Sequence, residues 1–145
     1  MAWTTYNPYR GKTPKKSKYG AKKATITNSD GTVLTFDSKK EMQRYTELRF
    51  PEQCGKISDL QRQVKFVLIP AQREPDTIGK RGGVVKGKLI EREVAYIADF
   101  MYFDNEKKQT IVEDAKGCKD GGAYALFVIK RKLMLERYGI RIREV

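Results

Sequence analysis

The sequence contains no histidine, which excludes Ser-His-Asp and Cys-His catalysis, a histidine general base and a His-ligated zinc site. Its two cysteines, Cys54 and Cys118, have no partners at metal-ligand spacing. We interpret them as free or packing thiols in a reducing cytoplasm, with a single disulfide as the alternative. Any catalysis by this chain therefore has to come from carboxylates and lysines.

Long apolar runs are also missing. No stretch approaches the ~20 apolar residues of a membrane-spanning helix, and the N-terminus carries no apolar signal region, so we expect neither membrane insertion nor export. The sequence has 145 residues, 39% hydrophobic and 33% charged, which predicts one globular domain in the cytoplasm. Its net charge of +12 favours nucleic acid as the partner over a membrane surface.

Acidic residues are absent from the first 23 positions, which carry seven Lys and Arg residues. We predict a flexible basic arm over residues 1–23 and a single domain over residues 24–145. A solvated tail without a role is the alternative for the arm. The arm lysines that we expect to bind DNA are Lys15, Lys16, Lys18, Lys22 and Lys23.

The pattern of apolar residues and turn signals predicts an α/β fold, a central mixed β-sheet flanked by helices. One helix begins at Asp37 or Ser38 and ends near Phe50, before Pro51. A mobile loop or hairpin wing carries a second basic patch, with Lys80 and Arg81. The predicted strands are 24–27 and 32–36 (a hairpin), 64–69, 93–103, 109–116 and 140–145; the second helix is 123–138, ended by Gly139, and the wing is 71–88.

Helical spacing places Glu41 on or beside the inward face that Tyr45 and Leu48 form, an unusual position for a carboxylate. In the strand around Asp99, alternation places that aspartate on one face with Ile97, Met101 and Phe103. An aspartate inside an apolar strand is costly unless it is paired or binds a metal.

The next strand presents Asp114 and Lys116 on one face and Glu113 on the other. If the two strands are neighbours, Asp99, Asp114 and Lys116 meet at one sheet edge, beneath the helix that carries Glu41. Such carboxylates can hold Mg²⁺, and a lysine can orient a water or neutralise charge during phosphodiester cleavage. The structural alternative is a buried Asp99–Lys116 ion pair with Asp114 exposed at a strand end, and spacing alone leaves both open.

These segments resemble a known family. Tyr96–Phe100 paired with Ile111–Gly117 resembles the core of the PD-(D/E)XK nuclease superfamily. Phe36–Glu41 resembles the helix-start motif by which phage-type junction-resolving and transposon end-cutting members supply an early glutamate. Lys18–Lys22 resembles the basic lead-in of phage junction-resolving endonucleases, and the chain from about Lys18 onward resembles small phage and prophage proteins assigned to this superfamily.

The resemblance implies a restriction-endonuclease-like core and a Mg²⁺ site, with Mn²⁺ able to substitute and no organic cofactor. It assigns metal ligation to Asp99, Asp114 and the Ala115 carbonyl, and to Glu41 directly or through water. Lys116 is the implied catalytic lysine. The sequence departs from the pattern in two places, since Ala98 stands where the superfamily has proline and Asp114 replaces the commoner glutamate.

Further polar residues are candidates for contact with DNA. Family members often place a glutamine near the site, as Gln63 would be, although a glutamine at a strand start is also unremarkable. Lys130 and Lys132, with Tyr124, can lie along the DNA, but residues two apart cannot share one helix face. A solvated helix surface is the alternative for this cluster.

We therefore expect a metal-dependent DNA endonuclease of phage or prophage origin, acting on branched or Holliday-junction DNA. The alternative is a non-catalytic DNA-binding protein that keeps the nuclease fold for packaging or replication. An RNA-directed protein is a third reading that charge alone leaves open. A homodimer would suit paired cuts in two DNA strands. This expectation follows from the reaction and not from any residue of the sequence.

Overall fold

The computed structural model describes residues 23–116 and 119–145. The chain divides into two compact units, Met1–Lys39 and Lys40–Val145. In the first unit, β1 (Ala24–Thr27) pairs antiparallel with β2 (Val33–Phe36), which confirms the predicted hairpin. Apart from Lys23, the predicted basic arm lies outside the described residues.

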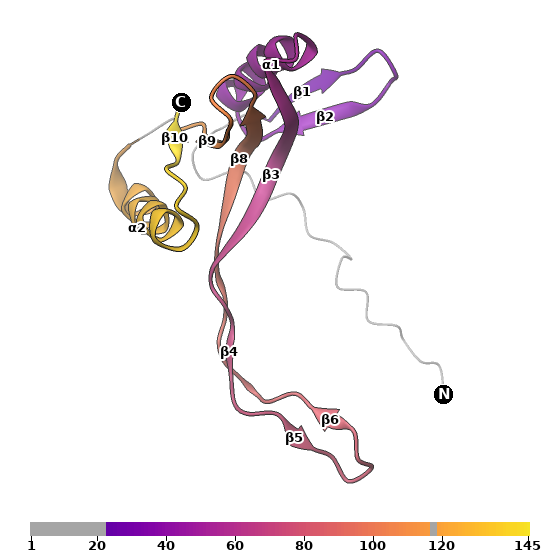
Figure 1. Cartoon of the computed structure of the whole chain (residues 1–145), viewed down its shortest axis with the longest axis vertical. Helices are drawn as coiled ribbons and strands as arrows, with labels where there is room; N and C mark the ends of the chain where they lie inside the picture. Colours follow the sequence, from indigo (N-terminus) through magenta and orange to yellow (C-terminus); the bar gives the residue numbers. More distant parts are fainter. Residues whose placement is uncertain (1–22, 117–118) are drawn as a thin grey trace. The chain divides into compact units, whose positions relative to one another are not determined.

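The second unit is built on a four-stranded mixed sheet of order β10-β9-β8-β3 (Figure 1). Its strands are β3 (Ile57–Ile69), β8 (Val94–Asp104), β9 (Gln109–Asp114) and β10 (Arg143–Glu144). Strand β10 runs parallel to β9, and the other neighbours are antiparallel. The α/β class with a mixed sheet is thus confirmed, and the predicted strand at 93–103 is central, as its apolar residues on both faces indicated.

Two strand predictions need correction. Strand β3 begins seven residues before the predicted start at Val64, because its first half is polar and does not look like a buried strand. Conversely, β10 covers only two of the residues predicted for the last strand. Short pairing at a sheet edge depends on the neighbouring strand more than on local propensity.

Helix α1 (Lys39–Gln53) and helix α2 (Gly121–Tyr138) accompany the sheet. The first continues past Pro51, where the sequence predicted its end, because proline removes only one backbone donor and the Cys54 N–H still bonds the Phe50 carbonyl at 3.0 Å. Gly139 ends α2 as predicted, in the left-handed region at φ 66°. No helix in the described ranges is long and apolar enough to cross a membrane.

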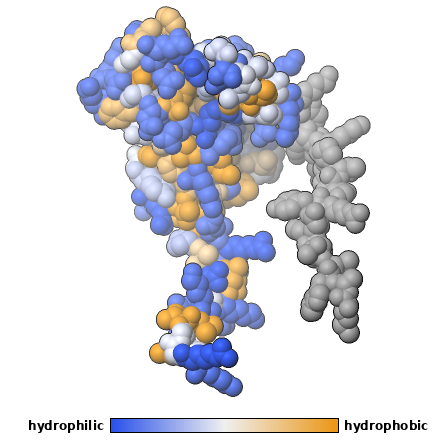
Figure 2. All heavy atoms as spheres, turned by 90° about the vertical axis from the view of Figure 1, so that its right-hand side faces the viewer, coloured by the Kyte–Doolittle hydropathy of each residue, from blue (hydrophilic) through white to orange (hydrophobic). Residues whose placement is uncertain are grey.

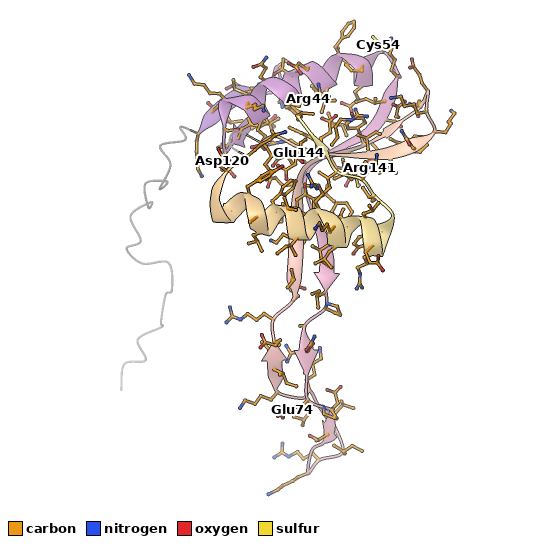
Figure 3. The ribbon with its side chains drawn as sticks, turned by 90° about the vertical axis from the view of Figure 1, so that its left-hand side faces the viewer. Arg44, Cys54, Glu74, Asp120, Arg141 and Glu144 are labelled. Carbon is orange, nitrogen blue, oxygen red and sulfur yellow. The ribbon has the colours of Figure 1, made fainter. Side chains whose placement is uncertain are left out.

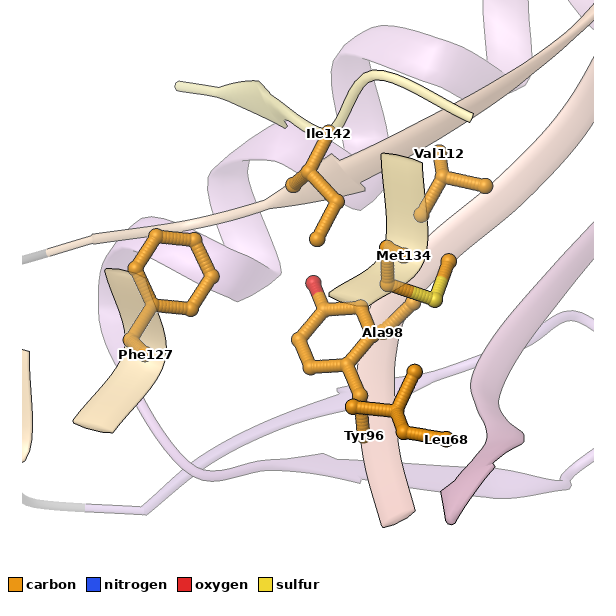
Figure 4. Packing of buried hydrophobic residues seen from close by; sticks show 7 residues of the cluster. All are labelled: Leu68, Tyr96, Ala98, Val112, Phe127, Met134 and Ile142. Atoms are coloured by element: carbon orange, nitrogen blue, oxygen red, sulfur yellow. The ribbon is translucent and has the colours of Figure 1, made fainter. Parts of the chain in front are cut away.

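The two helices cover opposite faces of the sheet. On one face, Tyr45 of α1 stacks on Phe100 of β8 with ring centroids 6.4 Å apart. On the other face, side chains of α2 close the main hydrophobic core (Figure 4). This core consists of Leu68, Tyr96, Ala98, Val112, Phe127, Met134 and Ile142.

The side chains of β8 change faces at Asp99, which corrects the predicted alternation. Before this residue, Tyr96 and Ala98 belong to the core under α2. After it, Phe100 packs on α1, whereas Met101 packs against the α2 core. Asp99 and Met101 therefore do not share a face as strict alternation predicted. The Asp99 carboxylate instead accepts hydrogen bonds from Gln63 of β3 and from the Ala115 N–H.

Between β3 and β8 the chain forms a long β-ribbon, where the sequence predicted a mobile loop or hairpin wing. Strand β4 (Gln72–Arg73) pairs with β7 (Leu89–Glu91), and β5 (Thr77–Ile78) pairs with β6 (Val84–Val85). The ribbon extends beyond the sheet (Figure 1). The hairpin alternative is confirmed, and we call residues 70–93 the ribbon below.

Candidate active site

Carboxylates from α1 and β8 are joined by a side chain of β3. Glu41 is only 3% exposed, on the face that also buries Tyr45 and Leu48, as helical spacing predicted. The Gln63 amide Nε2 donates to Glu41 Oε1 at 3.2 Å and to Asp99 Oδ1 at 3.3 Å. Gln63 therefore lies beside the two carboxylates, where the family resemblance led us to expect a glutamine, and it bridges them.

The backbone of Gln63 is in the left-handed region at φ 52°. A non-glycine residue pays a conformational cost there, and such strain concentrates at functional sites. In the strand register Gln63 falls between Arg62↔Phe100 and Val64↔Ala98, opposite the residue at which β8 changes faces. The left-handed backbone of Gln63 thus lies at the level where β8 changes faces, and its side chain reaches both Asp99 and Glu41.

Asp99 is held among other charged groups. Its Oδ2 accepts a hydrogen bond from the Ala115 backbone N–H at 2.8 Å. Burial raises the pKa of Asp99 to about 6; the Ala115 hydrogen bond opposes the rise, while the charges of Asp114 and Glu41 add to it. The protein alone therefore stabilises the ionised form of Asp99 poorly. A bound cation would stabilise this ionised form strongly.

Asp114 and Lys116 form the second half of the site. Lys116 Nζ lies 3.0 Å from Asp114 Oδ1, and the Tyr96 hydroxyl donates to Asp114 Oδ2 at 2.8 Å. Asp114 is 4% exposed. The structural alternative of an Asp99–Lys116 pair with an exposed Asp114 is therefore wrong, because the lysine pairs with Asp114 and that residue is buried. Burial, followed by the charge of Asp114, raises the pKa of Tyr96 and keeps its hydroxyl protonated.

Lys116 is positioned by two contacts that the sequence did not indicate. Its ammonium lies 4.0 Å from the centroid of the Phe127 ring, a cation–π contact from α2. Its backbone carbonyl accepts a hydrogen bond from Lys40 Nζ at 2.7 Å. Lys40 stands directly before Glu41 in α1, so this helix contacts both halves of the site. Arg62 is also near, with Nη2 3.8 Å from Glu41 Oε1.

A hollow of about 330 Å³ opens beside the Asp114–Lys116 pair. Its apolar wall includes Ile97 and Leu126, each 54% exposed, and Lys130 contributes a second cation next to Lys116. Lys132 instead lines a different hollow, between α2 and the segment before β10. The two lysines therefore serve different surfaces, as their spacing predicted, and only Lys130 belongs to the site. Tyr124 donates its hydroxyl to Glu144 Oε2 at 3.2 Å.

The remaining predicted DNA-binding residues lie elsewhere. Lys80 and Arg81 are exposed in the turn at the tip of the ribbon and do not join the carboxylates. Lys23 is exposed in the first unit. Lys15, Lys16, Lys18 and Lys22 lie outside the described residues. Of the thiols, Cys54 is exposed and free, and Cys118 is outside the described ranges.

Glu113 faces away from the site, as predicted. It is fully buried and receives hydrogen bonds from Arg44 of α1 at 2.8 and 2.9 Å and from the Tyr102 hydroxyl at 2.7 Å (Figure 3 labels Arg44). Burial alone would raise its pKa, but the hydrogen bonds from Arg44 and Tyr102 lower it below the usual value. This network anchors α1 to β9 and so fixes the distance between the elements that carry Glu41 and Asp114.

The donor set of the site suits a hard divalent cation. Within the described residues no three His, Cys, Asp or Glu side chains are grouped closely enough to hold a metal ion by themselves. Magnesium, however, commonly takes only one or two carboxylates and completes its shell with waters and phosphate oxygens. Asp99 and Asp114 supply such carboxylates. The sequence has no imidazole, and no thiol is among the site residues that the structure describes, so nothing there favours zinc.

Three comparisons with known proteins complete the description. A family model described as "Protein of unknown function (DUF1064)" matches residues 16–143. The comparison with curated proteins gives no match, and neither does that with solved structures.

Proposed function

The chain belongs to the DUF1064 family, and we propose that it is a metal-dependent DNA endonuclease with a restriction-endonuclease-like core of the PD-(D/E)XK type. We infer a phage or prophage origin, action in the host cytoplasm, and branched or junction DNA as the substrate. The proposal rests on one observation: Gln63 joins Glu41 to Asp99 while Ala115 joins Asp99 to the strand end that carries Asp114 and Lys116.

The cost of this arrangement supports a catalytic role. Asp99 has a pKa raised to about 6 by burial beside other carboxylates, and Gln63 adopts a left-handed backbone. A buried carboxylate of raised pKa and a left-handed non-glycine backbone each cost folding free energy. Enzymes commonly lose stability at their active sites because the groups needed for activity are unfavourable for folding. The costs at Asp99 and Gln63 fit such a site.

The chain's own residues have separable roles. Asp99 and Asp114 would hold the cation, with the Ala115 carbonyl and Glu41 as further oxygen donors. Gln63 and the Ala115 N–H orient Asp99, and Tyr96 orients Asp114. Lys116 neutralises negative charge that develops on the phosphate or orients the attacking water. When bound, the cation polarises the scissile phosphate and lowers the pKa of a water.

Lys130 and the hollow beside Lys116 would accommodate the substrate next to the reacting phosphate. Two ammonium groups at one hollow attract a phosphodiester backbone, and the apolar wall can take a base or sugar. This supports DNA as the ligand of the same site, since a wholly apolar pocket would fit a different class of molecule.

A non-catalytic DNA-binding protein is the competing candidate. The contacts of Asp114 favour this candidate, because Lys116 and Tyr96 already bond its two carboxylate oxygens. An aspartate with a purely structural role would make the same contacts. The two candidates differ in what they require of Asp99, since a binding module gains nothing from burying this carboxylate.

A cleavage assay separates the candidates. Duplex, single-stranded, flapped and four-way DNA are incubated with the full chain in Mg²⁺, with Asp99→Asn as the matched inactive variant. Cleavage of any of these by the wild type, absent in the variant and in excess chelator, supports the endonuclease. Tight binding without cleavage in Mg²⁺ and Mn²⁺ contradicts it and supports the binding module.

A further inference from the structure

The ribbon is an ordered part of the structure, and its residues have no role in the active site described above. Gly87 is buried, its N–H donates to Asp76 Oδ1 at 2.8 Å, and a Cβ added there would lie 1.7 Å from the Glu74 carbonyl oxygen. The Glu74 N–H in turn donates to the Lys88 carbonyl at 2.9 Å. The two strands therefore cross closely at a waist that only glycine permits, and the ribbon has a defined conformation.

Charge is segregated along the ribbon. Its acidic residues lie toward the base, where Asp76 bonds the waist and Glu93 pairs with Lys65 of β3. Residues 77–88 contain four cations and no carboxylate. These cations are Lys80, Arg81, Lys86 and Lys88, and none of them forms an ion pair within the described part of the chain. The tip is thus a cationic surface prepared for a polyanion.

Apolar side chains are exposed between these cations. Ile78 and Val84 pair across the ribbon and are 80% and 74% exposed, and Val85 is 52% exposed on the opposite face. Figure 2 shows apolar and polar side chains interleaved on the ribbon. A narrow ribbon cannot bury these side chains itself, so they are available to a partner that offers phosphates and apolar base edges together.

We propose that the ribbon tip docks in the major groove of duplex DNA between one and two helical turns from the active site, an inference that rests on DNA as the chain's substrate. The major groove is ~12 Å wide and admits a two-stranded β-ribbon. At ~3.3 Å per residue, the 17 residues from Gln63 of the site to Lys80 reach about 56 Å, which is between one and two turns of B-DNA at ~34 Å a turn. The four cations contact phosphates on both groove walls, and Ile78 and Val84 face base edges.

Duplex RNA is a poor fit for the same surface. The major groove of A-form RNA is deep and narrow, so side chains on a ribbon do not reach its floor. The proposal therefore predicts a preference for DNA over RNA duplex that resides in the ribbon. It also gives the protein a second contact with the DNA duplex next to the cut. Tight binding therefore requires a duplex that is long enough on that side to reach the ribbon tip.

The test compares two double variants of the full chain that remove equal charge. Lys80→Gln with Arg81→Gln alters the ribbon tip, and Lys107→Gln with Lys108→Gln alters the exposed turn at the opposite end of β8. Affinity for four-way DNA is measured in chelator by fluorescence anisotropy across a salt series. Losing two phosphate contacts lowers the slope of log affinity against log salt by about 1.8 for the tip variant; the control keeps the wild-type slope.

The length of the duplex arms of the DNA junction provides the second readout. Wild type and control are expected to bind junctions with 24-bp duplex arms several-fold more tightly than junctions with 8-bp duplex arms, whereas the tip variant binds both alike. Equal slopes and equal arm-length dependence in both variants would overturn the ribbon inference and leave the endonuclease proposal intact. A tip-dependent slope without cleavage in Mg²⁺ supports the ribbon and contradicts the endonuclease. A change in sedimentation instead of DNA affinity assigns the tip to a second copy and overturns the inference.

Discussion

Arg44 and Glu113 form a bidentate ion pair, with Nε 2.8 Å from Oε2 and Nη2 2.9 Å from Oε1. The carboxylate is fully buried, and the pair connects α1 to β9. The next residue, Asp114, points to the opposite face and pairs with Lys116. Two adjacent acidic residues of one strand therefore have different tasks, one in the fold and one in the candidate site.

Glu113→Gln is expected to destabilise the protein and leave the chemistry intact. Removing the charge leaves Arg44 with a neutral partner in a buried setting, which costs about 2 kcal/mol. Urea unfolding measures the loss, and cleavage per folded molecule is expected to stay near the wild-type rate. Asp114→Asn is the matched variant, with loss of cleavage by a factor on the order of 10²–10³ or more. The opposite pattern would show that Glu113 is the site residue.

Asp99→Asn is expected to stabilise the fold while abolishing cleavage. Because the pKa of Asp99 is raised to about 6 in the folded protein, ionising it costs folding free energy above pH 6, and this cost disappears as the pH falls toward the ordinary value. The variant should gain about 1 kcal/mol, or about 3 °C in Tm, at pH 7.5. At pH 4 the gain should be absent. A gain of the same size at both pH values would assign the effect to packing instead of ionisation.

Divalent cations are expected to bind at Asp99 and Asp114 even without DNA. Mg²⁺ or Mn²⁺ should raise the Tm of the wild type by linkage and should have no such effect on Asp114→Asn. In the presence of DNA, Mg²⁺ and Mn²⁺ should support cleavage, and Ca²⁺ should permit binding with little cutting. Full activity in excess chelator would contradict a metal-dependent mechanism.

Gly87→Ala is expected to disrupt the ribbon locally. The added methyl group would overlap backbone atoms of Glu74, which cannot move aside as a flexible side chain could. Gly83→Ala is the control, because a Cβ there meets nothing within 4 Å and its φ lies outside the left-handed region. Limited proteolysis should cut the ribbon of Gly87→Ala faster than that of Gly83→Ala. The Tm of the rest of the unit should be similar in both.

Periodicity alone predicted the parts of this protein that obey local rules. Helical spacing put Glu41 on the buried face with Tyr45 and Leu48, and strand alternation separated Asp114 from Glu113. A glycine at the end of an apolar helical pattern predicted the αL cap at Gly139. These features depend on residues within one or two turns of each other, so the sequence suffices to find them.

Tertiary structure decided the features that depend on residues distant in sequence. Strict alternation failed around Asp99, because packing against α1 and α2 decides which way the β8 side chains face, and Gln63 of the neighbouring strand bonds the carboxylate. The pairing of Lys116 with Asp114, the Phe127 ring beneath the ammonium, and the approach of Lys40 need three elements to be packed together first. The waist of the ribbon likewise depends on Gly87 meeting Glu74 across two strands. Local propensity determines where a strand or helix forms, but hydrogen bonds and charge contacts between elements exist only once burial has brought those elements together.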